Sequence, residues 1–311
     1  MNKTIEYLLN EFKTKAILAP MSGYSDIAFR ILCKKYNCAL TCTEFVSANA
    51  VIETNKKTLS LIKTDQTEKP NIVQIFGNDE NKILEAAKIL KNKFDIIDIN
   101  FGCPAPKITK NKAGSELLKD PKKIKIILET LISNINKPIT AKIRIGIDET
   151  NINVHEISKL IEKTGVEWIT IHGRTQKQGY SGKSNWKIIQ KIKEKSNIPI
   201  IGNGDVSSPE EFKEHLENTK VDGIMIGRAS LGNPYLFQQI YDYMTSGSYE
   251  TKDKLEQFEE YLELAIKYKI SFNDIKSQAM YFTKGSNGGS ELRSKIAKTK
   301  NLDELKLIFK F

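Results

Sequence analysis

The sequence is poor in the residues that build metal centres and disulfide frameworks. Its 311 residues include only 3 histidines, 4 cysteines and 2 tryptophans. Cys33, Cys38 and Cys42 lie close together, but without a CxxC spacing or a nearby histidine. We therefore expect these three to be buried thiols in a reducing compartment, and we expect no metal site. Cys103 lies apart from them, between a glycine and a proline.

Long apolar runs are also absent. No run reaches the roughly 18 residues that a membrane-spanning helix needs. Residues 1–17 mix charges with apolar side chains and lack the apolar core of a signal peptide. These absences predict a cytoplasmic protein without a membrane partner. We expect a monomer, although the sequence carries no direct signal of oligomeric state.

Arginine is scarce in a chain that is otherwise basic. Only 5 of the 48 basic residues are arginines, and the formal net charge is +10. Such a balance is typical of a nucleic-acid partner, because cations that neutralise phosphates release counterions. A general lysine bias of the chain would produce the same balance, so both interpretations stay open.

Short apolar runs alternate with amphipathic helical patterns over the first 245 residues. The runs are rich in β-branched residues and almost continuously apolar, as in parallel strands buried on both faces. They cover residues 16–20, 39–44, 71–76, 95–100, 138–145, 167–172, 198–203 and 222–227. Eight such units predict an α/β protein with a TIM (β/α)₈ barrel. A doubly wound open sheet would also alternate, but no GxGxxG loop follows the first run.

The end of the chain has a different pattern. Residues 245–253 resemble a linker, and only helical periodicity follows. We therefore divide the chain into a catalytic barrel, residues 1–245, and a small all-helical C-terminal domain, residues 250–311. From residue 269 to the end there are nine basic residues against four acidic ones. This balance predicts that the helical domain binds RNA.

Polar residues and glycines cluster where the predicted strands end. The active site of a TIM barrel is built at this edge. The candidate residues are Pro20, Met21, Gln74, Asn100, Cys103, Lys142, Arg144, His172, Asn203, Gly204, Asp205, Gly227 and Arg228. The last five follow strands seven and eight, which form the usual phosphate site of this fold. These glycines could also serve only as tight turns.

The chemistry of individual residues points to a redox site. Lys142 and Arg144 are two apart in one strand, so both point into the barrel, where a cation needs an acceptor or anion. A lysine there can support negative charge on a reduced flavin. Gln74 and Asn100 suit an imide edge, of flavin or of uracil, or else an internal network. Cys103, on a Gly-Cys-Pro turn, is placed to exchange a proton.

Two further residues are candidates for binding. His172 ends strand six and could bind phosphate, bind or protonate a substrate, or be a core histidine. The polar loop of residues 174–186 is long for a barrel loop and is a candidate substrate loop, with Tyr180 as a stacking or hydrogen-bonding group.

Taken together, several segments closely resemble the tRNA-dihydrouridine synthases. They read AILAPMSGYSD, TEFVSA, INFGCPAPKITKNKAGSELL, AKIRIGID, IHGRTQKQGYSGKSNW, IIGNGDV and MIGRASLGNP. The resemblance covers roughly residues 14 to 240, and the GCPAPK and HGRTxxQGYSG segments are its most specific parts.

The resemblance implies an enzyme that reduces the C5–C6 double bond of uridines in tRNA to dihydrouridine. It implies FMN as cofactor and NADPH, or NADH, as reductant, with hydride from flavin N5 to C6 and a proton from Cys103 to C5. The uridine would be flipped out of the RNA. The implied FMN ligands are Pro20, Met21, Gln74, Lys142, His172, Asn203, Gly204, Asp205, Gly227 and Arg228. The implied uridine ligands are Asn100, Lys142, Arg144, His172 and Tyr180.

The tail departs from the family's pattern. Family members often carry a Lys-His pair before an aromatic pair, whereas Ser277 and Gln278 occupy these places here. Lys276, Lys284 and Arg293 do fit. Two alternative functions stay open: an FMN oxidoreductase of a free pyrimidine, similar to dihydroorotate dehydrogenases, and a catalytically idle tRNA-binding barrel.

Overall fold

The barrel is closed by eight parallel strands. The computed structural model describes residues 14–286 and 288–309, so most of the N-terminal stretch considered above lies outside it. The strands are β1 (Ala16–Leu18), β2 (Leu40–Cys42), β4 (Asn71–Phe76), β5 (Ile96–Phe101), β6 (Ile139–Arg144), β7 (Ile169–His172), β8 (Ile200–Asn203) and β9 (Gly223–Ile226). Each pairs with its neighbours, and β1 pairs with β9, which closes the ring. The predicted TIM barrel and all eight strands are confirmed; a short strand, β3 (Val46–Ser47), is added beside β4.

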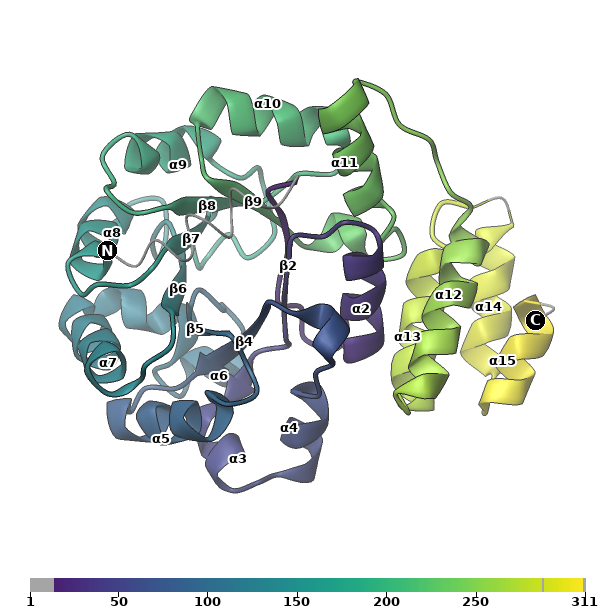
Figure 1. Cartoon of the computed structure of the whole chain (residues 1–311), viewed down its shortest axis with the longest axis horizontal. Coiled ribbons are helices and arrows are strands. Elements are labelled where there is room, and N and C mark those ends of the chain that lie inside the picture. Colours follow the sequence, from purple (N-terminus) through teal and green to yellow (C-terminus); the bar gives the residue numbers. More distant parts are fainter. Residues whose placement is uncertain (1–13, 287, 310–311) are drawn as a thin grey trace.

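Helices surround the strands and follow them in sequence (Figure 1). Around the barrel these are α2 (Ile27–Lys35), α3 (Ala48–Ile52), α4 (Lys56–Leu61), α5 (Glu80–Leu90), α6 (Pro106–Thr109), α7 (Pro121–Asn134), α8 (Val154–Glu162), α9 (Trp186–Lys193), α10 (Pro209–Thr219) and α11 (Leu236–Ser246). Short 3₁₀ turns are η1 (Gln66–Glu68), η2 (Gly114–Lys119) and η3 (Arg228–Ser230). Among the described residues no helix is long and apolar enough to cross a membrane.

Each strand divides its side chains between two cores. Residues such as Leu18, Ile97 and Ile171 pack outward against the helices. The alternate positions point inward, where Ile17, Ile72 and other apolar side chains form a separate cluster near the strand starts. Further along the strands the inward positions become polar. The barrel is therefore closed by apolar packing at one end and carries polar groups at the other.

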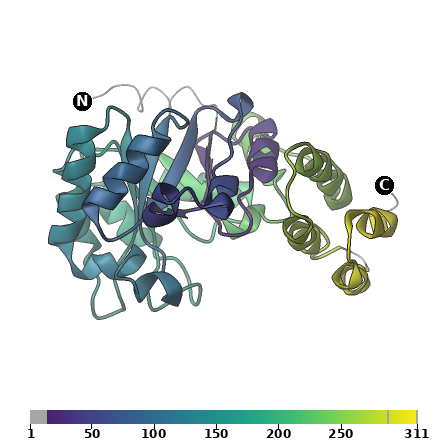
Figure 2. The ribbon, with the colours of Figure 1, turned by 90° about the horizontal axis from the view of Figure 1, so that it is seen from below.

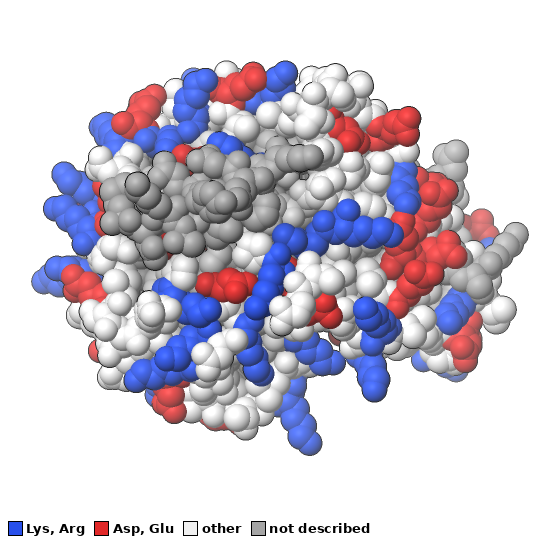
Figure 3. Space-filling view, in the orientation of Figure 1, with Lys and Arg blue, Asp and Glu red and all other residues white. Residues whose placement is uncertain are grey.

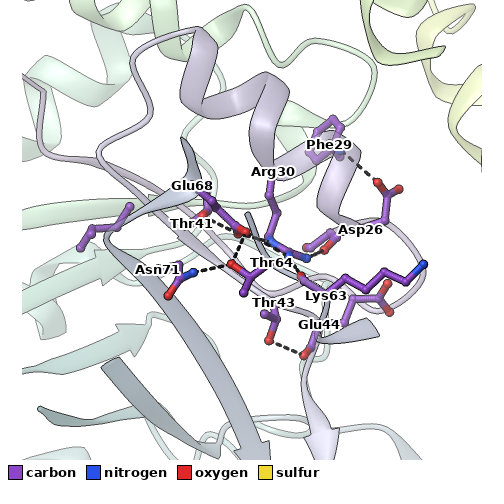
Figure 4. A network of polar contacts seen from close by, with 12 residues as sticks. Asp26, Phe29, Arg30, Thr41, Thr43, Glu44, Lys63, Thr64, Glu68 and Asn71 are labelled. Carbon is purple, nitrogen blue, oxygen red and sulfur yellow. Dashed lines mark hydrogen bonds and ion pairs between the residues drawn. The ribbon is translucent and has the colours of Figure 1, made fainter. Parts of the chain in front are cut away.

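A buried ion pair anchors α2 to the barrel wall (Figure 4). Arg30 of α2 and Glu68 of η1 have no exposed side-chain surface and are paired directly. Arg30 also donates to the carbonyl oxygens of Ser25 and Lys63, and Glu68 accepts from Thr41 Oγ1 at 2.9 Å. Because both charges are fully hydrogen-bonded, removing either partner would leave a costly unpaired charge. The network fixes the β1–α2 loop, which leads into the cavity described below.

Four helices follow the barrel and pack beside it (Figure 2). They are α12 (Lys254–Lys267), α13 (Phe272–Phe282), α14 (Gly289–Lys298) and α15 (Leu302–Phe309). No strand lies in the described part of this region, in agreement with the predicted helical tail. Helix α12 packs against α2 of the barrel. The two parts are thus joined through the segment that the Arg30–Glu68 pair holds.

The β1–α2 loop makes polar contacts with the helical domain. Tyr261 of α12 is fully buried, and its hydroxyl donates to Asp26 Oδ2 at 2.9 Å. Gln278 of α13 donates to the carbonyl oxygen of Tyr24 at 2.8 Å, and the Tyr281 ring meets Tyr24 edge-on at 5.0 Å. The helical domain therefore holds the same loop whose first residues, led by Pro20, border the cavity.

We predict that Tyr261→Phe lowers the free energy of unfolding by about 1.5–3 kcal/mol, because Asp26 loses a charged hydrogen bond in a buried interface. Tyr268→Phe is the matched control, since Tyr268 makes the same kind of bond to Asp65 at 2.8 Å, on a side chain that is only partly buried. Urea unfolding of both variants measures the difference. Equal losses would show that the Asp26 contact has no special weight.

Candidate active site

A cavity of about 620 Å³ opens at the carboxyl ends of the strands. Nearly all of the residues predicted from the strand ends line it. They are Pro20, Met21, Asn100, Cys103, Lys142, Arg144, His172, Tyr180, Asn203, Gly204, Asp205, Gly227 and Arg228. Gln74 is the exception: it is completely buried behind the cavity wall, with its amide bonded to Asn100 and Asp98. Its predicted contact with a flavin stays a prediction.

The turn that carries Cys103 is held from both sides. The side-chain oxygen of Asn100 accepts from the N–H groups of Gly102 and Cys103, at 3.0 and 2.8 Å. The carbonyl oxygen of Cys103 accepts from the backbone N–H of Ser115 at 3.0 Å and from its hydroxyl at 2.9 Å. Arg144 Nε donates to the carbonyl oxygen of Gly102 at 2.8 Å. The thiol is thereby fixed at the cavity wall.

The environment of Cys103 keeps its sulfur protonated. Burial raises the pKa of the Cys103 thiol, although a backbone hydrogen bond and the cations Arg144 and Lys142 act in the opposite direction. A protonated thiol is a proton donor, whereas a thiolate would be a nucleophile. Cys33, Cys38 and Cys42 are free and buried, as expected for thiols without surface chemistry.

Lys142 is a half-buried cation with few partners among the described residues. Its Nζ donates to Asn203 Oδ1 at 2.8 Å, and Asn203 in turn donates to the carbonyl oxygen of Met225. Burial, together with the nearby Arg144, lowers the pKa of Lys142 to about 8. Two of its three N–H groups remain available to an electron-rich ligand in the cavity.

His172 is a neutral side chain in this site. Burial lowers the pKa of His172 far below its ordinary value, and the cations Lys142, Arg144, Arg174 and Arg228 reinforce the effect. At neutral pH the imidazole therefore offers one donor and one acceptor rather than a charge. It suits a hydrogen bond to a ligand better than the role of an acid.

Arg174 begins the predicted substrate loop, but the sequence predicts no role of its own for it; the structure shows that it organises the wall after β7 and β8. It is 2% exposed and forms a bidentate pair with Asp205, at 2.9 and 2.7 Å. Asp205 also accepts from Arg228 at 3.3 Å. Burial opposes ionisation, but the bonds from Arg174 and Ser184 lower the pKa of Asp205 below its ordinary value. Its charge is thus balanced, and Arg228 can still face an anion.

Tyr180 forms an aromatic lid at the mouth of the cavity. It is 60% exposed, and its ring lies 4.5 Å from the guanidinium of Arg228 and 5.8 Å from that of Arg144. Arg144 holds the loop beneath it by donating to the carbonyl oxygens of Thr175 and Gly179, both at 2.8 Å. An exposed ring between two cations is well suited to stack on a planar ligand.

The helical domain reaches the cavity, which the sequence did not reveal. Tyr281 and Lys284 both line it. Other positions of the tail do not reach it: Gln278 is completely buried and bonded to the barrel loop at Tyr24, and Lys276 donates to the carbonyl oxygens of Ala297 and Thr299. Of the basic residues that fitted the family's pattern, only Lys284 lines the cavity.

The lining suits a flavin phosphate and ring. Lys142, Arg144, Arg174, Arg228 and Lys284 outnumber the acidic residues of the wall, Asp205 and Glu211, so the cavity is cationic. On the face shown in Figure 3, by contrast, basic side chains are scattered over the barrel, and acidic ones gather over the helical domain in the region of α12. The overall charge of +10 therefore does not by itself locate a partner.

Within the described residues no group of His, Cys, Asp and Glu could hold a metal ion.

Fold and cavity together define a TIM-barrel enzyme with its active site at the carboxyl edge of the strands. The sequence matches the dihydrouridine synthase (Dus) family model over residues 17–309. A probable tRNA-dihydrouridine synthase from Aquifex aeolicus is 35% identical over 305 residues, 96% of this chain and 95% of that protein. tRNA-dihydrouridine synthase B from Pasteurella multocida is 42% identical over 229 residues, 73% of this chain and 69% of that protein. The chain belongs to the dihydrouridine synthase family.

Among solved structures, histamine dehydrogenase from Rhizobium sp. 4-9 superposes with a TM-score of 0.56 at 12% sequence identity. The match covers 80% of this chain and 49% of that one. At this identity the similarity concerns the barrel fold alone.

We predict that Gly114→Ala displaces Cys103. Gly114 has φ +62°, and a Cβ there would lie 2.7 Å from the carbonyl oxygen of Cys103. Gly247→Ala is the matched control, because Gly247 has φ +78° but open space around it. Backbone strain costs each variant about 1–2 kcal/mol, and overpacking adds about 1–3 kcal/mol at Gly114 only. The two free energies of unfolding are measured in urea, together with the rate at which Cys103 is alkylated. Equal losses of free energy in both variants, with an unchanged alkylation rate, would contradict the close packing of Gly114 against Cys103.

Proposed function

We propose that this protein is a tRNA-dihydrouridine synthase that uses FMN, with NADPH or NADH as reductant, to reduce uridines in tRNA. The observation that carries the proposal is the thiol of Cys103, on a turn fixed at the wall of a cationic cavity in a chain of this family. Bound FMN, once reduced, would supply hydride from N5 to C6 of uracil. We also propose that the protein acts as a cytoplasmic monomer.

The predicted FMN ligands offer charged and hydrogen-bonding groups that suit this cofactor. Lys142 would lie against the electron-rich ring, where its charge favours the reduced form. Arg228 and the backbone at Gly204 and Gly227 would hold the phosphate, because the first N–H groups of η3 have no helical acceptor. Pro20 and Met21 would cover the ring from the β1–α2 loop.

The uracil would be read by groups that remain unpaired in the cavity. Asn100 uses one N–H for Gln74, which leaves its second N–H for a carbonyl of the base. Nε2 of neutral His172 lies 3.5 Å from Nη1 of Arg174, so its Nδ1 is the nitrogen left for the base, and no described residue accepts from Nη2 of Arg144. Tyr180 would stack against the base or its ribose once the uridine is flipped from the RNA.

Cys103 would protonate C5 of the base as hydride arrives at C6. Its raised pKa keeps the proton on the sulfur until the developing carbanion needs it, and the fixed turn sets the direction of transfer. Lys284 and Tyr281 would meet the RNA at the rim, because they are the cavity residues contributed by the helical domain.

We predict that Cys103→Ala binds FMN and oxidises NADPH as the unmodified protein does, but reduces uridine in tRNA roughly 10²–10⁴-fold more slowly, since a positioned acid is lost. Flavin absorbance, NADPH consumption and dihydrouridine content of the tRNA measure the three steps. Normal uridine reduction by the variant would rule out the acid role. Turnover of free uracil at the rate seen with tRNA would instead favour a small-molecule oxidoreductase.

A further inference from the structure

A row of polar side chains crosses the barrel interior below Cys103. Gln74, Asp98 and Thr140 stand opposite one another in the register of β4, β5 and β6. Asp98 accepts from Gln74 Nε2 at 2.6 Å and from Thr140 Oγ1 at 2.5 Å. Gln74 and Thr140 have no exposed surface and Asp98 is 3% exposed. None of the three lines the cavity.

The row continues upward to the turn that carries Cys103. Asn100 Nδ2 donates to Gln74 Oε1 at 2.6 Å, and Asn100 Oδ1 accepts from the N–H of Cys103 at 2.8 Å. A continuous chain of hydrogen bonds thus runs from the Asp98 carboxylate through two carboxamides to the backbone of Cys103. Every link is 2.8 Å or shorter.

The chemistry at the two ends fixes the direction of every bond between them. A carboxylate can only accept, and a backbone N–H can only donate. Gln74 must therefore point its NH₂ towards Asp98 and its oxygen towards Asn100. Asn100 must then point its NH₂ towards Gln74 and its oxygen towards the N–H of Cys103. If either amide turned over, two donors or two acceptors would face each other in a buried site.

The position of Asp98 needs an explanation beyond stability. Burial raises the pKa of Asp98 to about 6, although the bonds from Thr140 and Gln74 and the charge of Lys142 act against the rise. The carboxylate is therefore ionised at neutral pH, yet it forms no ion pair among residues 14–286 and 288–309. A buried unpaired charge costs stability that an apolar residue would not.

We propose that Asp98 is a positioning residue for Cys103, acting through the relay of Gln74 and Asn100 that orients the thiol turn. The proposal deepens the proposed function and rests on it for the meaning of the thiol. By fixing which atom of Asn100 faces the turn, Asp98 decides whether the N–H of Cys103 has an acceptor.

Alkylation of Cys103 by iodoacetamide tests the relay in the folded protein without FMN or tRNA, with the modified residue identified by mass spectrometry. We expect Asp98→Leu and Gln74→Met each to speed alkylation roughly 2- to 10-fold, because the turn opens more often once its acceptor is no longer oriented. The double variant should be no faster than the faster single variant, since both changes break one chain. Gln74→Met keeps the test usable if Asp98→Leu fails to fold.

Thr140→Val is the matched control. Thr140 is as buried as Gln74 and bonds to the same carboxylate, but it lies outside the path to Asn100. We expect it to lower stability while the rate and the pH profile of Cys103 alkylation stay unchanged. The proposal is overturned if Gln74→Met leaves the alkylation rate unchanged, if effects in the double variant add, or if Thr140→Val accelerates alkylation equally.

The same variants separate this proposal from the proposed function. With tRNA as substrate, the relay variants should lower kcat because the thiol is misplaced, and they should also raise KM because Asn100, which the relay orients, binds the base. If the alkylation pattern holds but the unmodified protein reduces no tRNA uridine, only the proposed function fails. If tRNA uridine is reduced but the relay variants leave the rate of Cys103 alkylation unchanged, only the proposal about Asp98 fails.

Discussion

The structure depends on one constraint: a polar group inside the closed barrel is costly unless it is hydrogen-bonded, so nearly all of the described ones, with the exception of Thr170, have partners on neighbouring strands or loops. In the lower half of the barrel the inward side chains, such as Ile17 and Ile72, are apolar and need no hydrogen-bond partner. In the upper half the inward side chains are polar and are mostly hydrogen-bonded to one another. Lys142 bonds to Asn203, and Gln74 bonds to both Asp98 and Asn100. The same bonds that satisfy buried groups therefore set the orientation of the groups that face the cavity.

Two parts of the chain outside the barrel wall also help to form the cavity. The β1–α2 loop borders the cavity at one end and is bonded to the helical domain through Asp26 at the other. The α13 region adds Tyr281 and Lys284 to the rim. The cavity is thus completed by the helical domain, which is consistent with a substrate large enough to contact both parts. A site for a small molecule would not need the second part.

The fold and most of the site could be predicted from the sequence because their signals are local. Each strand is a short apolar run, and the residues at its end lie at a common edge, so the pattern predicts that Lys142 and Cys103 lie there, and both line the cavity. Long-range partners left no such signal. The burial of Gln74 depends on Asp98 in the next strand, and the pairing of Arg174 with Asp205 joins residues 31 positions apart. Lys284 lines the cavity because of how the helical domain packs against the barrel. The spacing of residues in the sequence does not indicate that packing.

Reduction of tRNA uridines in this cavity is tested most directly by mapping dihydrouridine along every tRNA from cells that lack this protein and from the same cells with the protein restored. We predict that dihydrouridine disappears from at least one defined position and returns only with a protein that retains Cys103. An unchanged dihydrouridine map in cells lacking the protein would contradict it.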